Sequence, residues 1–196
     1  MFGTQHALIG MVHAAALPGT PLCARPMSQI IEQAVREARL LADAGFDAIL
    51  IENMHDRPYL LQHVGPEIVS GMSAVVDAVR HRVEKPLGVQ ILAGANREAL
   101  AVALGAGAQF IRAENFAFAH VADEGLMPRA DAGPLLRYRR EIGAEHIRIL
   151  ADVKKKHASH ALTADVDIAE AAQAAVFFGA DGVIVTGSAT GRPATP

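Results

Sequence analysis

Apolar runs alternate with helical stretches along almost the whole chain. Six runs rich in Val, Ile, Leu and Ala carry polar or charged residues at or near their ends, at 7–13, 47–53, 86–92, 110–115, 147–153 and 183–186. Between the first two runs, Ile30, Ala34, Ala38 and Leu41 recur at the three- to four-residue spacing of a helix. Strands that alternate with helices form parallel sheets with helical crossovers, so this pattern predicts an α/β fold of the TIM (β/α) barrel type.

Glycines and polar residues mark the ends of the predicted helices. Gly45, Gly107 and Gly179 each follow a helical stretch and stand just before an apolar run. Glycine adopts positive φ without strain and commonly ends helices. Further helices are predicted at 65–83, 96–104, 134–142 and 167–178, with Ser28 and Asn96 as caps of the first and third helices. The insertion 116–132 is typical of a functional lid or a mobile loop.

The number of strand–helix units falls short of a closed barrel. A barrel of this class has eight units in typically about 250 residues. This sequence has 196 residues and six predicted units. We therefore expect one domain over 1–196, a barrel incomplete at its C-terminal side. Its first and sixth strands would be open edges that can pair with a second copy, giving a homo-oligomer or aggregation.

Composition narrows the class of protein. The hydrophobic share is 51% and the mean hydropathy is +0.22, which excludes a disordered chain. The net charge of −3 argues against a nucleic-acid partner and leaves a small molecule as the expected ligand. Cys23 is the only cysteine, so no internal disulfide can form and a reducing, cytoplasmic location is expected. No apolar stretch reaches the roughly 18 residues of a membrane span, and no secretory signal is recognisable.

Polar side chains gather where the predicted strands end. In barrels, catalytic groups lie at the carboxyl ends of the strands, so these positions predict one common site. The candidates for acid–base catalysis are His13, Glu52, Glu114, Asp152 and His157. The candidates for substrate binding are Asn53, Gln90, Arg112, Asn115, Lys156, Thr186, Gly187 and Ser188.

Structural roles compete with these functional ones. Arg112 and Glu114 share strand parity, so they could form an ion pair, or Arg112 could bind an anion through two hydrogen bonds. Asp152 and Lys154 also share parity and could support acid–base or Schiff-base chemistry. Lys155, on the opposite parity, is expected to be solvated.

Two ligand hypotheses follow from residue types. His13, Glu52, Asp152 and His157 could together hold a divalent metal, although no close-set ligand spacing such as His-Glu-x-x-His occurs. The turn 186–191 is rich in glycine and hydroxyl groups, and its amides could bind an anion. In related barrels the phosphate lies in the loops after strands seven and eight.

In combination, these segments resemble the BtpA family. The similarity lies at 10–13, 17–21, 47–53, 56, 58, 88–92, 110–112, 123–125, 136–139, 151–153, 156–157, 185–187 and 190–191. The resemblance implies a TIM barrel of the ribulose-phosphate-binding kind and, for some members, a role in photosystem I biogenesis. Two departures stand out: the family continues beyond the Thr-Gly turn, and Lys154-Lys155 replaces a less basic pair.

Three functions are therefore open. The first is binding or transformation of a small anionic, phosphorylated metabolite at the strand ends. The second, implied by the resemblance alone, is a non-enzymatic assembly factor for photosystem I or another membrane complex, with peripheral membrane association. The third is an inactive truncated product.

Overall fold

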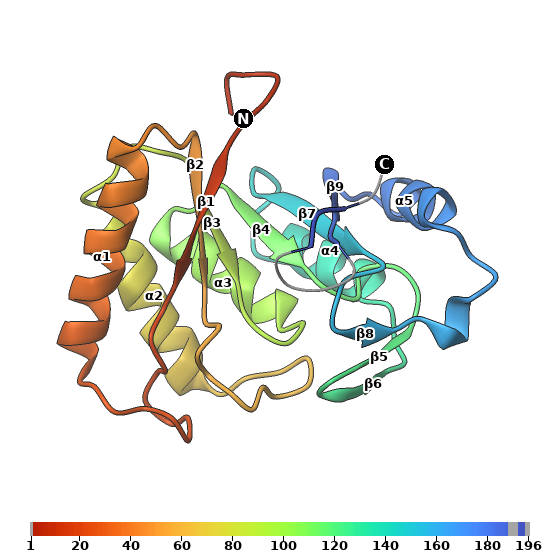
Figure 1. The fold of residues 1–196 in the computed structure, drawn as a ribbon, viewed down its shortest axis with the longest axis horizontal. Coiled ribbons are helices and arrows are strands. Elements are labelled where there is room, and N and C mark those ends of the chain that lie inside the picture. Colours follow the sequence, from red (N-terminus) through yellow and green to blue (C-terminus); the bar gives the residue numbers. More distant parts are fainter. Residues whose placement is uncertain (1, 188–191, 195–196) are drawn as a thin grey trace.

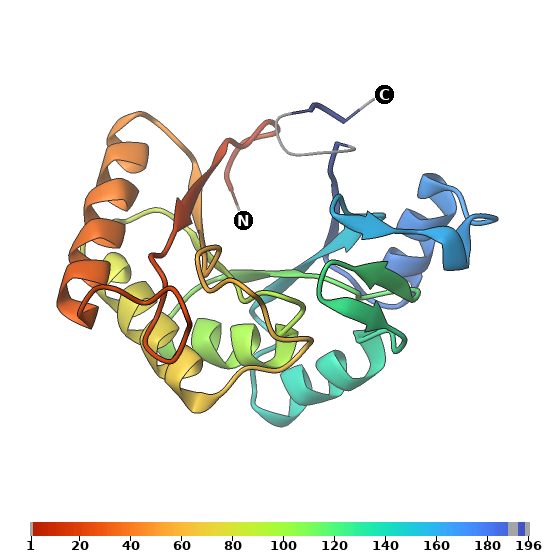
Figure 2. The same cartoon turned by 60° about the horizontal axis from the view of Figure 1, so that its bottom comes forward.

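The computed structural model describes residues 2–187 and 192–194, and a curled parallel sheet is its central element. The sheet has six strands in the order β1-β2-β3-β4-β7-β9, and every neighbouring pair is parallel. Their bounds are β1 (Ile9–His13), β2 (Ala48–Glu52), β3 (Leu87–Gln90), β4 (Phe110–Ala113), β7 (Arg148–Val153) and β9 (Gly182–Val185). The sheet forms an open half-barrel, with β1 and β9 on either side of the opening (Figure 2). The predicted α/β class and parallel sheet are confirmed.

Helices cover the convex face of this sheet (Figures 1 and 2). They are α1 (Met27–Asp43), α2 (Pro66–Arg80), α3 (Asn96–Ala106), α4 (Ala132–Glu141) and α5 (Ile168–Phe177). Alternate strand residues such as Ile49, Val89 and Ile111 are fully buried in the main core between sheet and helices. The intervening residues face the concave side, where Leu50 and Phe110 belong to a smaller apolar cluster. Both sheet faces are therefore apolar, as predicted for strands between helices and a barrel interior.

The predicted helix caps are wrong at two positions. Ser28 lies inside α1, whose N-cap residue is Pro26 and has no side-chain hydrogen bond. Asn96 is the first residue of α3, and its buried side chain bonds the backbone of Glu114 and the carboxylate of Asp131 instead. Asn96 therefore ties the start of α3 to the chain after β4, a long-range role that local sequence does not reveal.

The insertion 116–132 forms a second, smaller sheet. β5 (His120–Ala122) and β6 (Gly125–Met127) make an antiparallel hairpin, and β5 also pairs with β8 (Ala158–Ser159). These strands of two or three residues are too short to show periodicity in the sequence. A short 3-10 helix, Ala161–Thr163, follows β8. The hairpin brings the insertion over the chain segment that follows β7 (Figure 1).

The six-stranded sheet has β1 and β9 as its outer strands in the described part of the chain. Pairing of these edges with a second copy remains a prediction. Across residues 2–187 and 192–194, no helix combines the length and the apolar character needed to cross a membrane.

Candidate functional site

A cavity of about 550 Å³ lies at the carboxyl ends of the parallel strands. Residues from the ends of β1, β2, β3, β4 and β7 line it, as expected if these ends share one mouth. The sequence-predicted residues among them are His13, Glu52, Gln90, Arg112, Glu114, Lys156 and His157. The lining residues that the sequence did not single out for the site are Met11, Met54, Arg57, Tyr59, Leu92, Asp123, Glu124 and Lys155.

Asn53 lies outside the cavity lining and connects loops. Its amide nitrogen donates to Asp56 Oδ2 at 2.9 Å, and its Oδ1 accepts the backbone N–H of Leu92 at 2.7 Å. Asp56 in turn accepts the backbone N–H of Leu17 at 2.8 Å. Asn53 and Asp56 therefore fasten together the loops after β1, β2 and β3. Burial raises the pKa of Asp56, against the hydrogen bonds from Leu17 and Asn53.

Three other predicted ligands also lie outside the cavity lining. Asn115 donates its amide to the carbonyl of Arg129 at 2.7 Å. Thr186 accepts the backbone N–H of Lys156 at 2.9 Å through its hydroxyl oxygen, which links β9 to the loop after β7. Gly187 follows Thr186, whereas Ser188 and the rest of the predicted anion-binding turn fall outside the described residues.

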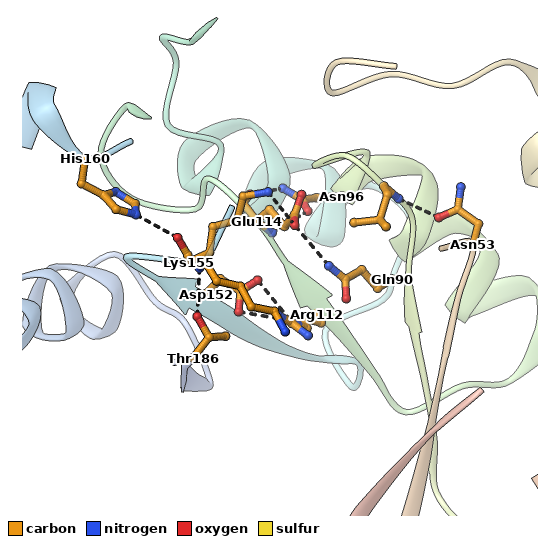
Figure 3. A network of polar contacts seen from close by, with 11 residues as sticks. Asn53, Gln90, Asn96, Arg112, Glu114, Asp152, Lys155, His160 and Thr186 are labelled. Carbon is orange, nitrogen blue, oxygen red and sulfur yellow. Dashed lines mark hydrogen bonds and ion pairs between the residues drawn. The ribbon is translucent and has the colours of Figure 1, made fainter. Parts of the chain in front are cut away.

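A largely buried polar network of Gln90, Arg112, Glu114, Asp152 and Lys155 adjoins the cavity (Figure 3), and all of these residues except Asp152 line it. Arg112 Nε lies 3.1 Å from both carboxylate oxygens of Asp152. Lys155 Nζ donates to Glu114 Oε1 at 2.9 Å, and Gln90 Nε2 approaches the same oxygen at 3.4 Å. The site therefore contains two ion pairs side by side. One joins Arg112 to Asp152, and the other is the buried ammonium–carboxylate pair of Lys155 and Glu114.

The network corrects three expectations about the charged residues. Arg112 pairs with Asp152 and not with Glu114. Lys155, expected to be solvated, has a side chain only 9% exposed. Lys154 instead donates to the carbonyl of Thr163 at 2.9 Å. The reason is local: β7 ends at Val153 and Lys154 takes a φ of +44°, so strand parity no longer decides where the next side chains point.

Burial raises the pKa of both carboxyl groups in the network. Burial raises the pKa of Glu114, although Lys155 opposes the shift. Burial likewise raises the pKa of Asp152, against the attraction of Arg112. A carboxyl group with a raised pKa can hold and release a proton closer to neutral pH, which suits general acid–base chemistry. Glu114 is the one of the two that lines the cavity.

His13 and Glu52 form a second acid–base pair at the ends of β1 and β2. His13 Nε2 lies 3.5 Å from Glu52 Oε2, and the two residues are register partners in the parallel ladder. The hydrogen bond to Glu52 raises the pKa of His13, while partial burial opposes the shift. The imidazole therefore retains its proton to higher pH and is placed to donate it inside the cavity.

We expect Glu52→Gln to lower the pKa of His13, because the carboxylate is the main cause of its elevation. A raised folded-state pKa contributes stability below the unfolded value, and this contribution is lost as pH rises through the folded pKa. The stability difference between wild type and variant should therefore be largest at acidic pH. NMR titration of the His13 ring protons in the wild type and the variant measures the shift. An unchanged His13 titration would contradict the pairing.

The hairpin β5–β6 adds two carboxylates to the cavity. Its tip carries Asp123 and Glu124, both in the lining. Ala122 and Met127 of the hairpin pack with residues of the loops after β2 and β3 in an apolar loop cluster, made of Met54, Tyr59, Leu92, Ala93, Ala122 and Met127. In the sequence, residues 123–125 (Asp-Glu-Gly) stood out only as part of the resemblance to the BtpA family. That motif was the one sequence signal for the two carboxylates of the tip.

Tyr59 connects the loop cluster to the cavity wall. Its hydroxyl donates to the carbonyl of Met54 at 2.6 Å, and burial raises its pKa to about 12. The phenol is therefore neutral at physiological pH and serves as a hydrogen-bonding wall residue.

The predicted metal ligands do not form one cluster. His13 and Glu52 face each other, Asp152 is engaged by Arg112, and His157 is a further residue of the cavity lining. Within the part of the chain that the structure describes, no three His, Cys, Asp or Glu side chains are grouped so as to hold a metal ion.

Comparison with proteins of known structure supports the fold. A proposed phosphonomutase from Burkholderia cenocepacia superposes with a TM-score of 0.56 at 17% identity, over 91% of this chain and 68% of that one. A 2,3-dimethylmalate lyase, a member of the PEP mutase/isocitrate lyase superfamily, superposes with a TM-score of 0.53 at 15% identity, over 92% and 58%.

Comparison of sequences identifies closer relatives. An uncharacterised mitochondrial protein of Caenorhabditis elegans is 50% identical over 193 residues, which cover 96% of this chain and 69% of that protein. The photosystem I biogenesis protein BtpA of a Synechocystis strain is 38% identical over 197 residues, covering 98% and 66%. The chain thus spans about two thirds of the length of these relatives. The family model described as "BtpA family" matches residues 4–195, and the chain therefore belongs to the BtpA family.

Proposed function

We propose that this chain binds a small anionic, phosphorylated metabolite in the cavity at its strand ends and transforms it by acid–base chemistry. The supporting observation is the convergence of five strand ends on one cavity of about 550 Å³, a size typical of metabolite sites. We further propose that the six-stranded sheet represents six of the eight units of a ribulose-phosphate-binding type of barrel. The name of the Burkholderia structural neighbour, a proposed phosphonomutase, favours a phosphorus-bearing ligand.

The cavity lining contains both cationic side chains that could bind an anion and side chains that could transfer a proton. Arg57 and Lys156 line it and are suited to bind the anionic group. The protonated His13, held by Glu52 at 3.5 Å, would act as general acid, with His157 as a second candidate. Glu114, whose pKa burial raises, would act as general base. Arg112 and Asp152 hold each other in place through contacts of 3.1 Å, so their charges would keep a fixed position next to the ligand.

We expect Lys156→Ala to weaken the binding of inorganic phosphate by about tenfold, because a charge-assisted hydrogen bond is lost. The matched control is Lys154→Ala, whose ammonium group donates to the carbonyl of Thr163 instead. Isothermal titration calorimetry on both variants and the wild type measures the effect. Equal weakening by both substitutions, or none by Lys156→Ala, would contradict the assignment of the anion-binding side.

The role in photosystem I assembly has less support as a general function. It comes from the name of the Synechocystis relative. Two other relatives, the Caenorhabditis elegans protein and an Archaeoglobus fulgidus protein at 34% identity, carry no such role in their names. The assembly-factor and inactive-product hypotheses both expect the cavity to bind no metabolite, so the phosphate titration separates them from the proposal.

A further inference from the structure

Three acceptor oxygens around the cavity have no hydrogen-bond partner in the described structure. They are Gln90 Oε1, Glu114 Oε2 and Glu124 Oε2, all screened from solvent. All three residues line the cavity at the strand ends. A buried acceptor without a donor is costly and uncommon in native proteins, so three around one cavity require an explanation.

Three donors of the buried polar network, Lys155 Nζ, Gln90 Nε2 and Arg112 Nε, contact oxygens other than the three acceptors. Lys155 Nζ and Gln90 Nε2 both approach Glu114 Oε1, at 2.9 and 3.4 Å, which leaves Oε2 without a partner. Arg112 directs its Nε to both oxygens of Asp152 at 3.1 Å. Glu114 is only 4% exposed, so its carboxylate has little contact with bulk solvent. The side chains of all three acceptors line the cavity, so a ligand donor would approach them from there.

The third acceptor lies on a separate element that is held in place. Glu124 belongs to the tip of the hairpin β5–β6, whereas Gln90 and Glu114 stand at the ends of β3 and β4 in the same lining. The hairpin is fixed by pairing of β5 with β8 and by Met127, which is fully buried in the loop cluster. The carboxylate of Glu124 is therefore positioned in advance, on a support other than the parallel sheet.

The other partnerless polar atoms among the described residues occur elsewhere. Asn115 Oδ1 and His120 Nε2 belong to residues that line another cavity of about 20 Å³, which Asp152 and Lys155 also line. Burial lowers the pKa of His120 to about 4, so this ring is neutral and contributes no charge to the larger cavity. Glu98 Oε2 belongs to a carboxylate of α3 whose other oxygen, Oε1, lies 3.2 Å from His63 Nδ1. The three acceptors at the strand-end cavity thus form a group of their own.

We propose that Gln90, Glu114 and Glu124 determine specificity by accepting hydrogen bonds from donor groups of the ligand. The ligand class is an anion that also carries hydroxyl or ammonium groups. A plain phosphate ester supplies the anionic group but not the hydrogen-bond donors. This inference rests on the proposed function for the anionic end. Hydroxyl and ammonium donors satisfy carboxylate and amide oxygens equally well in geometry, so the test includes both.

The test compares three phosphate esters of similar size by calorimetry: ethyl phosphate, glycerol 3-phosphate and 2-aminoethyl phosphate. We expect at least one donor-bearing ester to bind about tenfold more tightly than ethyl phosphate, the effect of one hydrogen bond to a charged group. Preference for glycerol 3-phosphate identifies hydroxyl recognition, and preference for 2-aminoethyl phosphate identifies ammonium recognition.

Variants at the hairpin tip isolate the acceptor. Glu124→Leu should remove most of the preference for donor-bearing esters over ethyl phosphate, and Glu124→Gln, which retains one acceptor oxygen, should restore part of that preference. Glu141→Leu, an exposed position at the end of α4, is the control.

The possible outcomes separate the two proposals. Equal affinity of the wild type for all three esters overturns the donor inference and leaves the proposed function standing. An equal loss for all three esters in Glu124→Leu also overturns it, because the residue would then only support the cavity. If none of the esters binds, the proposed function itself is wrong.

Discussion

Lys155→Met is expected to lower the free energy of unfolding by about 3–5 kcal/mol at pH 8, the usual cost of removing one partner from a buried ion pair. The substitution leaves the carboxylate of Glu114 buried without its 2.9 Å ammonium partner. Without that partner, the folded-state pKa of Glu114 should rise further above its unfolded value. A raised carboxyl pKa favours folding below the unfolded pKa, and this contribution is lost as pH rises through the folded pKa. The loss of stability should therefore be smaller at pH 5 than at pH 8.

Urea denaturation at both pH values measures this effect. The control Lys154→Met removes a hydrogen bond to the carbonyl of Thr163 and should cost only about 1 kcal/mol. The double variant Lys155→Met/Glu114→Gln removes the unpaired charge and should recover more than half of the loss. A cost below about 1 kcal/mol for Lys155→Met at pH 8 would show that the pair is not buried in solution.

Gly88→Ala is expected to cost about 3 kcal/mol, at the upper end of typical overpacking effects. Gly88 of β3 is the register partner of Phe110 in β4, and the aromatic ring lies over it. A Cβ at this position would stand 2.2 Å from Phe110 Cε2 and 2.3 Å from Cζ. Phe110 is 1% exposed and contacts Phe2 edge-on, so the ring has little room to move.

The clash can be separated from the general effect of replacing glycine. Gly105 lies in α3 with no atom within 4 Å of the position that an added methyl group would occupy, so Gly105→Ala should raise stability by about 0.5–1 kcal/mol. Phe110→Leu in the Gly88→Ala background should cost much less than the sum of the single effects, because neighbouring substitutions couple. Thermal denaturation of the four variants tests both points. Additive losses would mean that Phe110 does not cause the strain.

The strands and the place of the site could be predicted because both follow from local pattern. Apolar runs of the right length between helical stretches specify the six parallel strands, and the end of each run identifies polar residues such as His13, Glu52 and Glu114. Parallel strands share the direction of their carboxyl ends, so the convergence of these residues requires no further information. The roles of these residues in binding or catalysis remain predictions.

Which charged side chains pair with one another, and where the hairpin packs, could not be predicted from local pattern. Arg112 had carboxylates available on its own strand and on β7, and the structure selects Asp152. Lys155 is buried against Glu114 and Lys154 donates to the carbonyl of Thr163, because the chain leaves β7 with a positive φ at Lys154. The hairpin β5–β6 is stabilised by packing against distant loops, through Met127, and its short strands leave no periodic signal. Long-range contacts decide each of these features.

The order of the strands in the sheet, which repeats their order in the sequence, has a consequence for how the chain acquires its structure. After β1, each described strand of this sheet pairs with a parallel strand that was made before it. The sheet can therefore grow in the direction of synthesis as the polypeptide leaves the ribosome. The acid–base pair of His13 and Glu52 would assemble early in this process, and the network around Lys155 would follow once β7 has emerged.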